Sequence, residues 1–171
     1  MYQVRSGVFE TNSSSTHSIC ITTNRKTTMC HPDHVHFRCD DFGWEHRRLD
    51  STEDKAAYLY SSMLHIFEQK ELEKATAQIV DTLYKFKITC SFDKPEYRDY
   101  GSGLVYCINA SVDHCGEDDH REFVEKTVYN EGRLLRYLFS QDSFVLTGND
   151  NDYYDVGINV KYPHESFYKG N

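Results

Sequence analysis

A helical repeat of apolar side chains over residues 51–86 constrains the fold more than any other feature of the chain. Apolar residues recur there at intervals of three and four, which places them along one face of an α-helix. The two successive stripes are Ala56, Leu59, Tyr60, Met63, Leu64 and Phe67, then Leu72, Ala75, Ile79, Leu83 and Phe86. Ser51 stands at the position of an N-cap, and acidic residues follow it. Because residues 68–71 contain neither glycine nor proline, the pattern leaves open one long helix or two.

Short strands are expected on both sides of this helical region. Residues 34–39 alternate polar and apolar, which predicts a strand that buries Val35, Phe37 and Cys39 on one face. Other strands are predicted at 2–5, 18–23, 104–108, 143–146 and 156–161, and we expect the last two to form a hairpin. A last helix is predicted near 124–138, with Asp118 or Asp119 as its cap. Residues 40–50 and 90–103 are typical of loops. The sequence therefore predicts one α+β domain over 1–171, an antiparallel or mixed sheet packed against two or three helices.

Charge and cysteine content narrow the class of protein. The net charge of −8 argues against non-specific binding to nucleic acid or to an anionic membrane, and it favours a basic partner. Neither a secretory leader nor an apolar run long enough to span a bilayer is evident, so we expect a cytoplasmic protein. Six scattered cysteines in 171 residues are typical of reduced thiols in such a compartment.

The segment 7–18 is unusually rich in small polar side chains. Six hydroxyl residues and an asparagine lie there in near succession, and His17 is its one imidazole. Such groups bond to neighbouring backbone and favour a structured loop. One interpretation is an anion-binding loop formed by Asn12, Ser13, Ser14 and Ser15, with His17 as acid, base or donor. The other is a set of tight turns without a ligand.

This segment also carries a family resemblance. Residues 5–18, RSGVFETNSSSTHS, resemble the opening of a family of uncharacterised bacteriophage and prophage proteins. Residues 42–45 (FGWE) and 147–151 (TGNDN) are similar to the same family. The resemblance implies an origin in a phage and a location in the cytoplasm of a bacterial host. It implies no particular activity and no cofactor.

Two further stretches invite a metal interpretation. Residues 30–39 hold two cysteines and three histidines, but on an extended strand His34 and His36 face away from Cys39, so a four-ligand zinc site does not close. A His34/His36 pair with a third ligand such as His17 or His46 stays open, beside a simple exposed histidine face. Residues 148–155 resemble a calcium loop but lack the required glycine and glutamate, and a hairpin turn explains them. We predict no metal.

A third stretch, residues 113–120, surrounds His114 with carboxylates. A histidine between acids is capable of general acid–base chemistry. An acidic turn that precedes a helix explains the same residues and is the simpler interpretation.

Two functions follow from these observations. The favoured one is a binding protein that inhibits or diverts a host protein with a basic nucleic-acid groove, for example as an anti-CRISPR protein. Its expected contact residues are Trp44, Asp150, Asp152, Tyr153, Tyr154 and Asp155. The alternative is a small hydrolase or transferase for a phosphorylated or nucleotide-like substrate, with His17 and His114 as acid and base. The alternative requires these two histidines to meet in space.

Overall fold

The computed structural model describes most of the chain. The described residues are 15–23, 29, 31–43, 45, 47–99, 105–113, 117–149 and 164–170, with the backbone alone for 15, 16, 105, 106, 117–119, 149 and 164–170. The helices are α1 (Thr52–Ile66), α2 (Gln69–Lys85), α3 (Glu117–Val128) and α4 (Glu131–Phe139). The strands are β1 (Ser15–Thr22), β2 (His34–Phe37), β3 (Asp41–Phe42), β4 (Arg47–Leu49), β5 (Thr89–Phe92), β6 (Tyr97–Asp99), β7 (Val105–Cys107), β8 (Ser111–Val112), β9 (Phe144–Asn149) and β10 (His164–Gly170).

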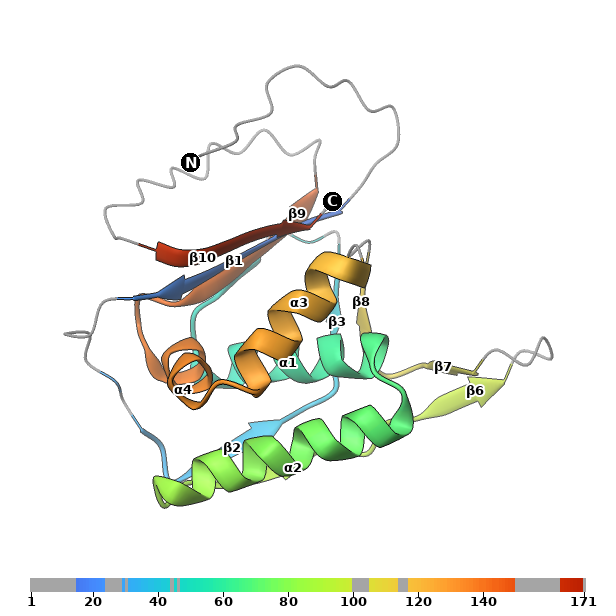
Figure 1. Ribbon diagram of the computed structural model, residues 1–171. Coiled ribbons are helices and arrows are strands. Elements are labelled where there is room, and N and C mark those ends of the chain that lie inside the picture. The colour runs from blue at the N-terminus through green and yellow to red at the C-terminus, as the bar shows by residue number, and fades with distance from the viewer. Residues whose placement is uncertain are drawn as a thin grey trace.

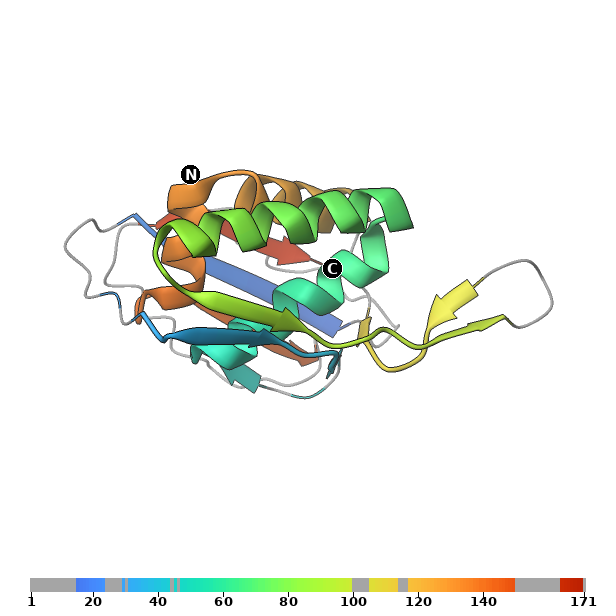
Figure 2. The same ribbon diagram turned by 90° about the horizontal axis from the view of Figure 1, so that it is seen from below.

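The strands form one larger sheet and three pairs. The four-stranded sheet has the order β10-β1-β9-β4 with antiparallel neighbours, whereas β2–β5 and β3–β8 are parallel pairs and β6–β7 is an antiparallel pair. Helices α1, α3 and α4 lie between the large sheet and a layer formed by α2 and the β2–β5 pair (Figure 1). Strands β6 and β7 project from this body (Figures 1 and 2). The predicted α+β class is confirmed.

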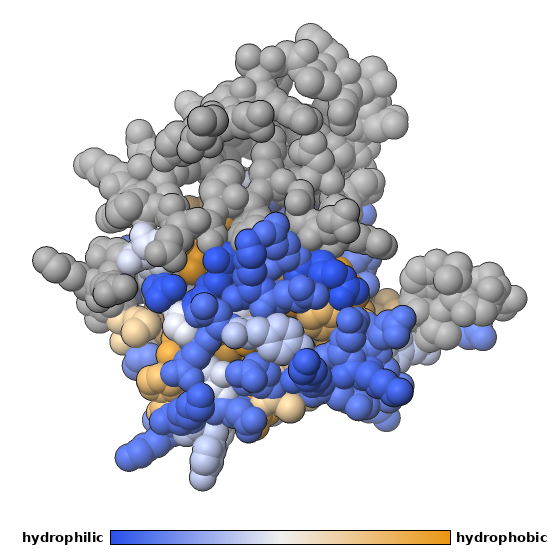
Figure 3. All heavy atoms as spheres, in the orientation of Figure 1, coloured by the Kyte–Doolittle hydropathy of each residue, from blue (hydrophilic) through white to orange (hydrophobic). Residues whose placement is uncertain are grey.

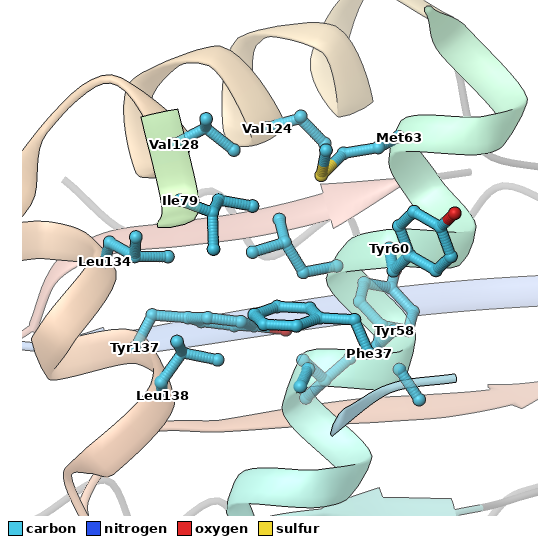
Figure 4. Packing of buried hydrophobic residues seen from close by; sticks show 14 of the residues in the cluster. Phe37, Tyr58, Tyr60, Met63, Ile79, Val124, Val128, Leu134, Tyr137 and Leu138 are labelled. Atoms are coloured by element: carbon cyan, nitrogen blue, oxygen red, sulfur yellow. The ribbon is translucent and has the colours of Figure 1, made fainter. Parts of the chain in front are cut away.

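Helix α1 is the centre of the core. Its residues from Lys55 to Leu64 are all buried, because β2, β8, α3 and α4 surround it. Side chains from α1, α2, α3, α4 and β2 converge in one apolar cluster (Figure 4). A helix buried on all sides needs apolar residues around its circumference, which α1 has. None of the helices in the described part of the chain is long and apolar enough to cross a membrane.

Lys55 is the one cation in this buried stretch of α1. Its Nζ donates to the carbonyl oxygens of Ser140 (2.8 Å) and Ser143 (3.0 Å), in the connection between α4 and β9. Burial lowers the pKa of this amine to about 8, against the opposing charge of Asp50. The lysine therefore fastens α1 to the segment that enters the large sheet.

The two apolar stripes form two helices. Ser51 caps α1 as predicted, since its hydroxyl accepts from the Asp54 N–H at 3.0 Å. The chain then leaves the helix at Phe67, and Glu68 and Glu71 form a reciprocal capping box that starts α2. This capping box is the local sequence signal for the boundary between α1 and α2. Glycine and proline, the more familiar signals for such a boundary, do not occur in residues 68–71. Helix α2 buries one narrow stripe, and hydrophilic side chains dominate the outer face of α2 and α3 (Figure 3).

The strand predicted at 34–39 is confirmed over its first four residues. Val35 and Phe37 are buried and His34 and His36 are exposed, while Cys39 lies beyond the strand and is half-buried. The neighbouring loop predictions were wrong in part, because β3 and β4 lie within 40–50, and β6 and most of β5 lie within 90–103. Most of these strands pair with partners far away in sequence, which no local pattern reveals.

The C-terminal half differs from expectation in three places. The predicted last helix is two helices, with Asn130 as N-cap of α4, and Asp118 and Asp119 lie within α3 instead of capping it. Ile108, expected in an interior strand, is exposed. Strand β9 pairs with β1 and β4, and β1 separates it from β10. The predicted strands at 2–5 and 156–161 lie outside the described residues.

Candidate functional site

A groove of about 1290 Å³ lies where three parts of the fold meet. The β3–β8 pair forms one side, the end of α1 and the start of α2 form another, and β6 and β7 complete it. In Figure 1 these elements lie together beside the last turn of α1. The groove is larger than most sites for a single small molecule, and its size suits a segment of polypeptide.

The floor of the groove is apolar and its rim is acidic. The apolar lining residues are Phe42, Leu64, Phe67, Ile108, Ala110 and Val112. Four carboxylates share the lining with one guanidinium and one imidazole. These charged and titratable residues are Asp40, Asp41, Glu45 and Asp113, then Arg47 and His65. The groove therefore attracts cations, and Ile108 adds exposed apolar surface to the same lining.

Short contacts hold the acidic rim in place. Asp41 Oδ1 accepts from the Ser111 hydroxyl at 2.9 Å, across the β3–β8 pair. The Asp113 N–H donates to the carbonyl oxygen of Phe42 at 2.7 Å. A Cβ at Gly43 would lie 3.1 Å from the Cβ of Asp113, so a glycine permits this close approach. The positions of the carboxylates are thus set by the backbone of the pair.

Asp40 lies close to two arginine side chains. Arg38 donates to Asp40 Oδ2 at 3.1 Å, and Arg47 lies 3.8 Å from the same oxygen. Arg38 also bonds Asp54 at 2.9 Å, which ties this corner to the first turn of α1. Asp40 is therefore a structural acid, and Asp41, Glu45 and Asp113 add further negative charge to the same lining.

His17 lies in β1 and belongs to a buried cluster of three side chains. Its predicted place at a loop tip was wrong, since the strand begins at Ser15 and the His17 side chain has no exposed surface. The hydroxyl of Tyr58 in α1 lies 3.1 Å from His17 Nδ1 and 2.9 Å from Nε2 of His120 in α3. The rings of Phe42 and Phe123 pack against Tyr58. The cluster joins β1, α1 and α3 through one hydroxyl.

His120 of this buried cluster is neutral at physiological pH. Burial lowers the pKa of His120 to about 3, and the nearby His17 and His65 add to the effect. A hydroxyl has one hydrogen to give, so Tyr58 donates to one imidazole and accepts from the other. The cluster is a hydrogen-bonded tie within the core, out of contact with solvent.

His34 and His36 lie on the exposed face of the β2–β5 pair. Both are within hydrogen-bond distance of the hydroxyl of Ser91 in β5, through His34 Nε2 (2.9 Å) and His36 Nδ1 (2.8 Å). His36 Nε2 lies 3.0 Å from Asp93 Oδ1. No group of three metal-ligating side chains occurs among the described residues. The hydrogen-bond partners observed for His34 and His36 are oxygen atoms of β5 and of Asp93, which follows it.

Most of the other predicted site residues lie outside the described part of the chain. These are Asn12, Ser13, Ser14, Trp44, His114, Asp150, Asp152, Tyr153, Tyr154 and Asp155, and for Ser15 the structure describes the backbone alone. The prediction that His17 and His114 act together stays untested. Gly43 and Glu45, the sequence neighbours of Trp44, both line the groove.

No sequence motif marks several of the residues that the fold brings together. His65 and His120 carry no motif, and Asp41 stands in a segment predicted as a loop. For Ser91 a signal exists, because Thr89, Ser91 and Asp93 alternate at the strand period and match His34 and His36. Comparisons of the chain with protein-family models, with curated proteins and with solved structures find no match.

Proposed function

We propose that this chain works by binding a partner protein, and that the groove holds a basic segment of that partner. The observation that carries the proposal is a lining that combines apolar side chains, of which Ile108 is the most exposed, with an excess of carboxylates. Lysine and arginine side chains combine an apolar stem with a cationic head, which suits such a lining. The net charge of −8 extends the attraction beyond the groove and favours fast encounter with a basic surface.

The resemblance to phage proteins suggests where the partner is found. A phage protein acts in the host cytoplasm, so the proposed partner is a host protein. Proteins that hold nucleic acid have basic grooves, and a defence nuclease such as a CRISPR effector has charge complementary to this chain. Inhibition would follow when the acidic protein occupies the surface that normally holds nucleic acid.

The described geometry lends no support to the enzyme alternative for a phosphorylated substrate. His17, its proposed acid or base, is fully buried and bonded to Tyr58. An acidic groove also repels phosphate. The alternative therefore rests on His114 and on Asn12 to Ser15, as the sequence left it.

A charge-reversal experiment tests the binding proposal. Asp41→Lys combined with Asp113→Lys reverses two rim charges, whereas Glu73→Lys combined with Asp81→Lys makes the same change on the exposed face of α2. The two variants have equal net charge, so any difference between them reports the groove. Each protein is used as bait for affinity purification from bacterial host cells, and a labelled peptide of alternating arginine and leucine is titrated in parallel.

We expect the groove variant to lose the host protein recovered by the unchanged chain, while the α2 variant retains it. The groove variant should bind the peptide at least about ten-fold more weakly, and added salt should weaken binding to the unchanged chain. Equal recovery with both variants, or equal losses, would contradict the groove as the binding site.

A further inference from the structure

The outer face of the β2–β5 pair gathers side chains that are known for group-transfer chemistry. The two strands are parallel, with His34 opposite Thr89 and His36 opposite Ser91. Alternation along each strand turns these side chains outward, while Val35 and Phe37 face α1. Figure 2 shows β2 and β5 in front of α1 in the view from below. A histidine pair thus lies over a row of hydroxyls on a surface open to solvent.

The hydrogen bonds of this face form one continuous chain. When His36 donates from Nε2 to Asp93 Oδ1 (3.0 Å), its Nδ1 is left to accept from the Ser91 hydroxyl (2.8 Å). The oxygen of Ser91 then accepts from His34 Nε2 at 2.9 Å. His34 Nδ1 in turn accepts from Thr89 Oγ1 at 2.8 Å when this hydroxyl turns its one hydrogen away from its other acceptor, the carbonyl oxygen of Asp33 at 3.0 Å. With both imidazoles neutral, all of these bonds point toward the carboxylate.

Asp93 is fixed more firmly than an ordinary surface acid. Its Oδ2 accepts from the N–H of Cys39 at 3.0 Å, which leaves Oδ1 aimed at His36. Its own N–H donates to the carbonyl oxygen of Phe37, and its carbonyl oxygen accepts from the Tyr60 hydroxyl, both at 2.9 Å. A carboxylate held in this way orients an imidazole, as the acid of a serine–histidine–aspartate triad does.

We propose that Ser91, His36 and Asp93 form a catalytic site for acyl transfer from carboxylic esters. Ser91 is the nucleophile, His36 is the general base and then the general acid, and Asp93 is the positioning residue for His36. His34 presents an N–H beside Ser91 Oγ, where it donates to the oxyanion that forms on the attacked carbonyl.

The reaction balances without any further reactant than water. Ser91 Oγ bonds to the carbonyl carbon of the ester while its proton passes to His36 Nδ1. The bond to the alcohol then breaks, and His36 returns the proton to the departing alkoxide. Water adds to the acyl group and gives a proton to His36, the bond to Ser91 breaks, and Ser91 takes the proton as the carboxylic acid leaves.

The substrate class follows from the openness of the face. His34 and His36 are exposed and Ser91 is partly exposed, so an ester reaches the hydroxyl directly from solvent. Compact esters with a good leaving alcohol fit such a surface, because they demand little binding and little help for the leaving group. The site shares no residue with the lining of the acidic groove, so a test of one proposal does not decide the other.

Ser111 provides a matched control within the same chain. It lies on the other parallel pair, is exposed, and donates to a carboxylate (Asp41 Oδ1, 2.9 Å), but the hydrogen bonds described there include no imidazole. The full-length chain is treated with a fluorophosphonate, which transfers its phosphonyl group to an activated serine and releases fluoride. Peptide mass mapping then gives the labelling rate at each serine.

We expect Ser91 to be labelled at least about 100-fold faster than Ser111, within the range of general-base catalysis. Ser91→Ala should remove the label at that position. His36→Ala should slow labelling of Ser91 by a similar factor, and added imidazole should restore part of the rate in that folded variant. Equal rates at Ser91 and Ser111, no labelling, or no effect of His36→Ala would overturn the proposal and leave a structural ladder of hydrogen bonds.

The role of Asp93 is tested by a measurement that would stay the same if Asp93 only stabilised the fold. With p-nitrophenyl acetate as substrate, Asp93→Asn should lower kcat about ten-fold or more while KM stays the same, because the base loses its orientation and the surface that meets the ester is intact. An unchanged kcat would remove Asp93 from the site.

Discussion

Two regions of this molecule repeat one arrangement, a hydroxyl between two imidazoles, in opposite surroundings. In the core, Tyr58 stands between His17 and His120. On the outer face of the β2–β5 pair, Ser91 stands between His34 and His36. The bond lengths are alike, from 2.8 to 3.1 Å, so hydrogen-bond geometry does not separate the two regions. Burial does.

Burial decides what such an arrangement contributes. A buried polar atom that loses its partner costs the free energy of its lost hydration, about 1–3 kcal/mol. The exposed His36–Asp93 pair, with side chains 49% and 39% exposed, is worth about 0–1 kcal/mol, because water and salt screen it. The core cluster is therefore a stability element, whereas the outer network adds little stability and stays accessible to reactants.

Lowering the pH should destabilise the protein through the core cluster of His17, Tyr58 and His120. This is the largest change in the free energy of unfolding that we expect. The folded-state pKa of His120 is about 3 against 6.5 for the free side chain, so the unfolded chain binds the proton more readily between these values. The stabilisation is complete above pH 6.5 and falls as the pH drops toward 3. We expect a loss of roughly 2 kcal/mol by pH 5, and of roughly 4 kcal/mol by pH 3, in the free energy of unfolding. Urea unfolding from pH 8 to pH 4 measures it.

The exposed histidines provide the control for this acid effect. A chain with His34→Gln and His36→Gln should keep the same loss of stability between pH 7 and pH 5, since His120 is unchanged. If the double variant abolishes the loss, the buried cluster is not its source.

Tyr58→Phe should have the next largest effect. The ring and its apolar contacts remain, but the buried imidazoles of His17 and His120 both lose the hydroxyl, at a cost of roughly 2–4 kcal/mol. Tyr84→Phe makes the same chemical change at a side chain 78% exposed, and it should leave stability within about 0.5 kcal/mol. Urea unfolding at pH 7.5 compares the two, and equal effects would contradict the role given to burial.

Ser91→Ala should have the smallest effect on stability. Water replaces the lost partner of His34 and His36, so we expect a change within about 0.5 kcal/mol. At the buried Ser143, whose hydroxyl accepts from the Thr22 N–H at 3.1 Å, the same substitution should cost about 1–2 kcal/mol. Thermal and urea unfolding of the two alanine variants test this order. A large loss from Ser91→Ala would show that the outer network is structural.

The candidate sites were only partly predictable. The exposure of His34 and His36 followed from alternation, because one strand fixes which face each side chain takes. Their partner Ser91 lies 55 residues from His36, in a segment that proline and glycine mark as irregular, so local pattern could not pair them. The acidic groove depends in the same way on the pairing of Asp41 with Ser111 across 70 residues.

The sequence by itself determined the local elements and their faces. The apolar stripes of 51–86 specified α1 and α2, Ser51 specified where the first begins, and Glu68 with Glu71 holds the signal for the second. These features are set by neighbours within four residues, whose interactions a helix fixes by its geometry.

Only the tertiary structure decided which of the polar residues meet and which of them see water. His17 sits in a segment rich in hydroxyls, yet pairing of β1 between β9 and β10 carries its imidazole into the core beside Tyr58 and His120. Ser91 alternates with Thr89 and Asp93 in the sequence, yet only the pairing of β5 with β2 places it between two histidines and near a fixed carboxylate. The physical reason is that burial and long-range pairing depend on how whole elements pack, and the free energy of a polar group depends on that environment more than on its sequence neighbours.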